Sequence, residues 1–190
     1  MTTSSPRLAE GISRAAEERG LEALDAPVSG GDVGARDASL VLMVGGRQEA
    51  FDRAVLLFEQ LAKSITLLAP AGNGQRCKLV NQIAVAVGMV AWCEALAVAK
   101  AARLDPSMVQ GVIGGGAAGS WGLSNLAPRA LSADFQPGFL VRHLVKDICL
   151  AQEEADSHGV HLPGLEVARR LYEILKEAGY GEAGTQVLFH

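Results

Sequence analysis

The sequence of 190 residues predicts an α/β part followed by an all-α part. In residues 1–70, apolar runs with helical spacing alternate with short apolar runs typical of strands, which is the pattern of an α/β sheet. From about Gln75 to Arg103 the chain has no proline and one glycine, Gly88, so we expect one helix of roughly 40 Å. No strand pattern follows it before the last few residues. We therefore predict two domains, 1–70 and 71–190.

The α/β part begins with a helix. Ser5 is a good N-cap residue and Pro6 suits the first helical position. Gly20 ends this helix, whose apolar face consists of Leu8, Ile12, Ala15 and Ala16. Strands are predicted over residues 24–28, 39–44 and 65–68. A second helix is predicted between the last two strands, from the spacing of Phe51, Val55, Phe58 and Leu61.

The all-α part continues beyond the long helix. Asp105 and Pro106 start a helix that the glycines at 114–116 end. Three more helical stretches are predicted, over residues 120–131, 140–158 and 163–178.

Composition limits the function classes. Hydrophobic residues make up 49% and charged residues 20% of the chain, which is enough apolar material for a buried core. The net charge of -4 argues against a nucleic-acid surface. The three cysteines, Cys77, Cys93 and Cys149, show neither paired nor metal-ligand spacing. We expect buried thiols in a reducing cytoplasm and no metal site.

No segment is expected to cross a membrane or direct export. The first residues lack the charged and then apolar layout of an export signal. The apolar stretch Ile83–Ala99 is close to the minimum length of a membrane span, but it contains Glu94 and is rich in alanine. We interpret it as a core or subunit-interface helix of a cytoplasmic protein.

Two groups of residues are candidates for chemistry. Lys78, Asn81 and Gln82 lie at i, i+3 and i+4, so a helix presents them on one side. A lysine facing an enclosed site can carry a proton, and neighbouring amides can hold a substrate hydroxyl. A solvated lysine with two amides near a helix start would give the same pattern, so the spacing alone does not select a function.

The second group is the turn formed by Ser29, Gly30 and Gly31 after a predicted strand. Glycines let backbone N–H groups approach a carboxylate closely, and the serine hydroxyl adds a donor. An ordinary strand-to-turn junction would have the same composition.

Together the two groups carry a family resemblance. LDAPVSGGDVGA (24–35) and GNGQRCKLVNQ (72–82) match, in order, the D-A-P-V-S-G-G and G-x-G-x-x-x-K-x-x-N-[NQ] motifs of the β-hydroxyacid dehydrogenases. HLVKD (143–147) and TTSSP (2–6) resemble two further family segments. The sequence is therefore similar, over essentially its whole length, to a family that includes 3-hydroxyisobutyrate dehydrogenase and 2-hydroxy-3-oxopropionate reductase.

The resemblance implies a role for each matched residue. Lys78 would be the catalytic lysine, taking the substrate hydroxyl proton during hydride transfer to the nicotinamide ring and returning it in the reverse reaction. The implied substrate-binding residues, for a small 3-hydroxy acid or its semialdehyde, are Ser29, Gly30, Gly31, Asn81 and Gln82. Asparagine is the commoner family residue at position 82, and the 2-hydroxy-3-oxopropionate reductase branch is similar to this sequence in having glutamine.

The cofactor implied by the resemblance is NAD or NADP. Thr3 and Lys146 would contact it, and Asp147 would orient Lys146. The family's nucleotide domain begins with a strand, a G-x-G-x-x-G loop and a helix, and this sequence has no such unit. Residues 1–70 would then be an α/β remnant, the second half of a Rossmann-like domain. The chain is therefore expected to be a truncated or fragment form that is inactive alone.

Two other functions fit the same residues. One is a non-catalytic oligomerisation or small-acid-binding module derived from the family. The other is an enzyme of another reaction class, in which Lys78 forms an imine with a carbonyl substrate.

A homo-oligomer is also expected. A helix that is apolar nearly all round is normally buried on all sides, and in a chain of this size a second subunit would supply part of that cover over Ile83–Ala99. Members of the resembled family associate through their helical domains, which implies the same for this chain.

Overall fold

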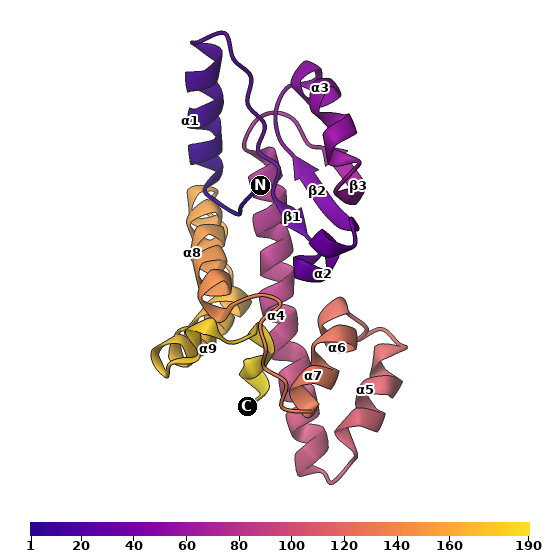
Figure 1. Cartoon of the computed structure of the whole chain (residues 1–190). Helices are drawn as coiled ribbons and strands as arrows, with labels where there is room; N and C mark the ends of the chain where they lie inside the picture. Colours follow the sequence, from indigo (N-terminus) through magenta and orange to yellow (C-terminus); the bar gives the residue numbers. More distant parts are fainter. The chain divides into compact units, whose positions relative to one another are not determined.

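The computed structural model describes residues 1–190 and divides into two compact units (Figure 1). Unit 1 contains Met1–Gln82 and Cys149–His161, and unit 2 contains Ile83–Ile148 and Leu162–His190. The predicted fold class is confirmed: a small sheet with helices precedes a helical region built on one long helix, α4 (Asn73–Ala101). The predicted domains, 1–70 and 71–190, follow the order of elements along the chain, whereas the two units are defined by packing. The predicted domain boundary therefore stays a prediction.

The sheet of unit 1 has three strands in the order β1-β2-β3 (Figure 1). The strands are β1 (Val28–Ser29), β2 (Leu40–Val44) and β3 (Ala62–Leu67). β1 runs antiparallel to β2, whereas β2 and β3 are parallel and joined through α3 (Gln48–Phe58), which packs on β3. The core of this layer is formed by Ala26, Leu40, Leu42, Val44, Phe58 and Ala62.

The first predicted strand, over residues 24–28, was largely wrong. Only Val28 of that range belongs to β1, and Asp25 forms a single antiparallel bridge with Gly45. Pro27 lies between these two contacts and has no N–H to donate, so the ladder is interrupted there. Its carbonyl still accepts the N–H of Met43 at 3.1 Å.

Two helices of unit 1 differ from expectation in detail. α1 (Pro6–Glu17) starts after Ser5 as predicted, but the Ser5 side chain makes no capping hydrogen bond. The face predicted to be apolar is largely exposed, with Leu8 at 56% and Ile12 at 54%. A short helix, α2 (Gly31–Arg36), follows β1 and was not predicted.

Unit 2 consists of helices and two 3-10 turns. Its separate elements are α5 (Pro106–Gly114), α6 (Trp121–Asn125), α7 (Ala127–Leu131), α9 (Pro163–Glu177), and 3-10 turns at Tyr180–Glu182 and Thr185–Phe189. Asp105 caps α5 by accepting the N–H of Ser107 at 2.9 Å, as its position predicts. The single helix predicted over 120–131 is two helices, because Pro128 cannot donate the N–H that would continue α6.

Two long helices contribute residues to both units: α4 and α8 (Val141–Ser157). The buried side chains of α4 follow helical spacing, at Gln75, Lys78, Leu79, Gln82, Ala86, Met89, Trp92, Cys93, Leu96 and Ala99. The stripe is mainly polar up to Gln82 and apolar beyond it. By length and mean hydropathy alone α4 is the one helix that could cross a membrane, and 44% of its most apolar window is buried.

All three cysteines are free. Cys93 is buried as expected, whereas Cys77 and Cys149 are partly exposed. Burial, with the Glu94 carboxylate acting in the same direction, raises the pKa of Cys93 to about 12, so this thiol stays protonated near neutral pH.

The start of α4 packs against the sheet through two glycines. A Cβ atom placed on Gly74 would lie 2.4 Å from the carbonyl oxygen of Met43, and one on Gly45 would lie 2.7 Å from the backbone nitrogen of Gly74. Both distances are shorter than any side-chain carbon tolerates, so the backbones can approach only because neither residue has a side chain.

We predict that Gly74→Ala destabilises the chain by about 1–3 kcal/mol, because the added methyl group forces the helix start away from β2. Gly88→Ala on the same helix is the matched control. Nothing lies within 4 Å of a Cβ at that position, so alanine should stabilise by roughly 0.5–1 kcal/mol. Urea unfolding of the three proteins measures both effects, and equal stability of Gly74→Ala and wild type would contradict the close packing.

Candidate active site

The first turn of α4 is capped by a side chain distant in sequence. The Asp25 carboxylate accepts the N–H of Gly72 at 2.7 Å and the N–H of Gln75 at 2.8 Å. A helix leaves its first N–H groups without intrahelical partners, and a carboxylate there is also favoured by the helix dipole. Asp25 is itself fixed by two backbone hydrogen bonds to Gly45, at 3.0 and 2.7 Å. The segment that contains Ser29–Gly31 and the helix that carries Lys78 are therefore joined by one carboxylate.

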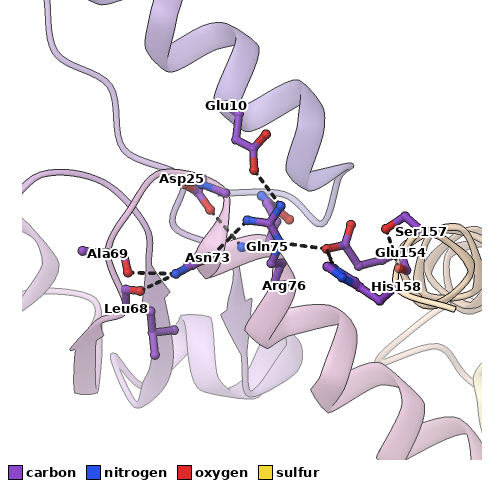
Figure 2. Close-up of polar contacts among 11 residues, drawn as sticks. Glu10, Asp25, Leu68, Ala69, Asn73, Gln75, Arg76, Glu154, Ser157 and His158 are labelled. Carbon is purple, nitrogen blue, oxygen red and sulfur yellow. Dashed lines mark hydrogen bonds and ion pairs between the residues drawn. The ribbon is translucent and has the colours of Figure 1, made fainter. Parts of the chain in front are cut away.

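Neighbouring residues of the same turn also bind partners outside the helix, as Figure 2 shows. The Asn73 amide donates to the carbonyls of Leu68 and Ala69, both at 2.8 Å. The Arg76 guanidinium donates to Glu10 of α1 at 2.6 Å and to Glu154 of α8 at 2.7 Å. These contacts tie the beginning of α4 to three other segments of unit 1.

Lys78 lies one turn further along α4. It is 8% exposed and is the only buried residue among the chain's 17 lysines and arginines. Lysine is almost never buried without a partner, because taking an ammonium group out of water is costly. A solvated lysine, the alternative left open by the spacing, is therefore contradicted for this residue.

The two amides after Lys78 differ in their surroundings. Gln82 is 2% exposed and accepts a hydrogen bond from the Asn81 amide at 2.8 Å. Asn81 itself is half-buried. Lys78 and Gln82 thus belong to the buried polar stripe of α4, and the Asn81 amide holds the side-chain oxygen of Gln82.

The turn at 29–31 has the backbone that glycine favours. Gly30 has a φ of 128° and Gly31 a φ of 64°, and both are exposed, whereas Ser29 is half-buried. A side chain at position 30 would also press against Leu40, at 3.2 Å. The serine hydroxyl and adjacent peptide groups are donors of the kind that a carboxylate needs.

Thr3 lies in a segment that is held at its two flanking peptide groups. The Gln75 amide nitrogen donates to the Thr2 carbonyl, and the Gln75 amide oxygen accepts the Ser4 N–H, both at 2.9 Å. The predicted cofactor-contacting residue is therefore fixed from the helix that carries Lys78.

Lys146 and Asp147 belong to the part of α8 that lies in unit 2. Asp147 is 1% exposed, and its carboxylate forms an ion pair with the Lys146 ammonium at 2.9 Å. The Lys146 side chain remains 45% exposed. The buried Asp147 carboxylate therefore holds an ammonium group that stays accessible. The sequence has no glycine-rich loop of the kind that holds the pyrophosphate.

No group of three or more metal-ligating side chains comes together in the structure. The charged groups near α4 are instead arranged as ion pairs. Burial opposes ionisation of Glu154, but hydrogen bonds from Arg76 and His158 outweigh it, so the pKa of Glu154 lies below its usual value.

Comparisons with known proteins identify the family of this chain. Residues 72–189 match the family model described as the NAD-binding domain of NADP-dependent 3-hydroxyisobutyrate dehydrogenase. Residues 1–69 match the NAD-binding domain of 6-phosphogluconate dehydrogenase. Both models describe NAD-binding domains, so the cofactor of this family is NAD or NADP.

Individual relatives support the same assignment. An uncharacterised oxidoreductase of Bacillus subtilis, YkwC, is 49% identical over 189 residues, which cover 100% of this chain and 66% of the relative. The crystal structure of 3-hydroxyisobutyrate dehydrogenase from Salmonella typhimurium has a TM-score of 0.91 at 28% identity, covering 98% of this chain and 66% of that one. The Mycobacterium tuberculosis 3-hydroxyisobutyrate dehydrogenase with L-serine has a TM-score of 0.90 at 31% identity, covering 99% and 67%.

The fold and these matches relate the chain to the nicotinamide-dependent oxidoreductases. The chain belongs to the β-hydroxyacid dehydrogenase family, typified by 3-hydroxyisobutyrate dehydrogenase. It spans about two thirds of the length of these relatives.

Three residues that hold the candidate site together were not predicted to have a role. Asp25, Gln75 and Arg76 all lie inside the two quoted motifs. Their roles depend on partners 47 to 78 residues away, which apolar periodicity does not reveal. The only signal in the sequence was that each occupies a motif whose lysine or glycines had already been assigned.

We predict that the Glu154 contacts stabilise the chain above about pH 4.5 and are lost below it. Because folding lowers the pKa of this carboxyl from 4.5, its contribution is present above the unfolded-state pKa and disappears as the pH falls through the folded-state value. Glu154→Gln should cost about 1–3 kcal/mol at pH 7 and progressively less toward pH 3. Glu153→Gln, at an exposed neighbouring position, is the control. Denaturant unfolding across this pH range measures the difference, and a pH-independent effect would exclude the ion pair as its cause.

Proposed function

We propose that this chain carries the proton-transfer and substrate-holding groups of an NAD(P)-dependent oxidation of a small 3-hydroxy acid to its semialdehyde. The observation that carries the proposal is the burial of Lys78, alone among the chain's lysines and arginines. The helix that carries Lys78 is fixed by the Asp25 carboxylate. Asp25 belongs to the motif that resembles the family's substrate-binding segment. Membership of the family and the L-serine complex of the Mycobacterium relative also support a small hydroxylated acid as ligand.

Lys78 acts as the general base in oxidation. A neutral Lys78 amine takes the proton of the substrate hydroxyl while the hydride leaves the carbinol carbon, and the resulting ammonium returns that proton in the reverse direction. Proton transfer of this kind contributes on the order of 100- to 10,000-fold to the rate. Burial suits Lys78 to this role, because it keeps bulk water away from the amine that exchanges a proton with the substrate.

The substrate carboxylate is held by the Ser29 hydroxyl and the backbone N–H groups at Gly30 and Gly31. The amides of Asn81 and Gln82, on the same helix as the lysine, bind or orient the hydroxyl end. Holding both ends of a small acid fixes the carbinol carbon, and such positioning is a large part of catalysis in two-substrate reactions.

By the family resemblance, Thr3 and Lys146 would each contact NAD or NADP, and Asp147 would keep the Lys146 ammonium in place. When bound, the nicotinamide ring accepts the hydride. In the longer relatives, the G-x-G-x-x-G unit belongs to the part that this chain does not match. We propose that this part binds the pyrophosphate of the cofactor. The exposed apolar residues of α1, Leu8 and Ile12, are consistent with a face that such a part covers.

The first test measures turnover with 3-hydroxyisobutyrate. The chain alone is expected to show none, and turnover is expected when it is fused behind the N-terminal third of the Bacillus subtilis relative. In that hybrid, Lys78→Met should lower kcat about 100- to 10,000-fold with little change in KM, because the lost step is proton transfer. Lys63→Met, at an exposed position on β3, is the control.

The outcomes separate the candidate functions. Turnover by the Lys78→Met hybrid at the wild-type rate would remove Lys78 from the mechanism. Binding of 3-hydroxyisobutyrate without turnover in the hybrid would favour the small-acid-binding module. Borohydride trapping of a carbonyl substrate on Lys78 would instead favour the imine-forming class.

We also propose that the chain forms a homodimer or higher oligomer through its helical region. Exposed apolar side chains on α4 and α5 support this, with Val98 at 67%, Met108 at 68% and Val112 at 72%. Met108 and Val112 are four residues apart on α5 and so share one face, and exposed apolar side chains favour association with another protein surface.

The oligomer is tested by light scattering at micromolar concentration. Wild type should have at least twice the chain mass of 19.8 kDa, and the double variant Met108→Lys, Val112→Lys should shift to the mass of one chain, since two charges would be desolvated in the interface. Leu56→Lys, at a position that is 72% exposed in unit 1, is the control and should not dissociate the oligomer. A wild-type mass of one chain would refute the proposal.

A further inference from the structure

The Gln75 side chain makes an uncommon pair of hydrogen bonds. Its amide nitrogen donates to the Thr2 carbonyl and its amide oxygen accepts the Ser4 N–H, each at 2.9 Å. A carboxamide has a donor on one side and an acceptor on the other, so it can bond a C=O and an N–H of the same backbone stretch. The carboxamide thus holds both peptide groups that flank Thr3, and Gln75 is only 4% exposed.

Gln75 is in turn fixed by the cap of α4. Its backbone N–H donates to the Asp25 carboxylate at 2.8 Å, beside the bond from Gly72 to the other oxygen of that carboxylate. Figure 2 shows Asp25 and Gln75 together at the start of α4. Three sequence motifs, at 2–6, 24–35 and 72–82, therefore meet at this one residue.

The rest of the N-terminal segment docks on the same turn. Gly72, with a φ of 89°, leaves room for Glu10 and for the Pro6 carbonyl, each of which would lie 3.0–3.1 Å from a Cβ at that position. Glu10 also accepts a hydrogen bond from Arg76 at 2.6 Å. The contact at Gln75 is therefore part of a continuous docking of residues 2–10, and it holds the peptide groups on both sides of Thr3.

Lys78 follows Gln75 by three residues and lies on the same buried stripe. We propose that Gln75 is a positioning residue, whose carboxamide sets the Thr3 backbone against the nicotinamide end of a bound dinucleotide, in fixed relation to Lys78. This inference rests on the proposed function, because it gives Thr3 the cofactor contact assigned there. Gln75 itself touches neither ligand.

A glutamine that only anchored the N-terminus would give a different result from one that positions a ligand contact. Loss of an anchor lowers stability without discriminating between ligands. Loss of a positioning residue weakens binding of the nicotinamide end and leaves binding of the small acid unchanged, because the acid is held by residues 29–31 and 78–82.

The test begins with hydrogen exchange of the Ser4 amide in the 190-residue chain. Gln75→Met keeps the side-chain length but has neither donor nor acceptor, so Ser4 exchange should become about 10-fold faster or more. Gln110→Met is the matched control, because the Gln110 amide also donates to a backbone carbonyl, that of Leu123 at 3.0 Å. Unchanged Ser4 exchange in Gln75→Met would overturn the proposal.

The second measurement uses two probes, nicotinamide mononucleotide and 3-hydroxyisobutyrate, with NMR titration of the same chain. Gln75→Met should raise the dissociation constant for the mononucleotide about 10-fold and leave that for the acid within error. If wild type binds both probes and the variant binds both equally well, Gln75 is only an anchor and this proposal alone fails. If wild type binds neither probe, the proposed function fails and this inference fails with it.

Gln75→Glu tests whether ligand binding can be restored by pH. A purely structural role of Gln75 would not produce such a recovery of affinity. As a carboxylate, the new side chain accepts the Ser4 N–H but repels the Thr2 carbonyl. As a carboxylic acid it again offers one donor and one acceptor. Mononucleotide affinity of Gln75→Glu should therefore recover toward wild type as the pH falls through the titration of that carboxyl, and Gln75→Met should show no such recovery. Parallel pH profiles for the two variants would overturn the proposal.

Discussion

The arrangement of unit 1 depends on the Asp25 carboxylate and the first turn of α4. This carboxylate accepts two N–H groups that the helix cannot satisfy internally, and its charge lies at the positive end of the helix dipole. Because Asp25 is 47 residues before Gly72, the contact does more than cap a helix. It determines where α4 begins relative to β2, and the glycines at 45 and 74 leave the space that this approach needs.

The buried side of α4 is polar at its start and apolar further along. Its buried stripe carries Gln75, Lys78 and Gln82 first and then only apolar side chains from Ala86 onward. Apolar burial stabilises the later turns directly, whereas a buried lysine costs several kcal/mol unless its surroundings compensate. The tertiary hydrogen bonds at the helix start supply rigidity where apolar packing is weakest. A buried ionisable group at such a position is a candidate for a functional role.

Apolar periodicity predicted the elements whose burial is local. β2, α3, α4 and α9 were found within a few residues of their predicted bounds because one face of each packs on its neighbours. The strand over 24–28 failed at Pro27, and the face of α1 containing Leu8 proved exposed. The matched motifs identified Lys78 and Ser29–Gly31 as candidates. They did not reveal Asp25, Gln75 or Arg76 as positioning residues, because those roles exist only through partners far along the chain.

The spacing within residues 72–78 follows from these contacts. Gly72 adopts a positive φ and admits Glu10, Gly74 allows the backbone to touch β2, and Gln75 holds the segment around Thr3. Lys78 then comes three residues later, roughly 4.5 Å further along the helix axis and on the same side. A helix turn is stiff, so Thr3 and Lys78 cannot move independently once Asp25 has fixed that turn. One carboxylate thus sets the position of a proposed cofactor contact and of a proposed proton carrier.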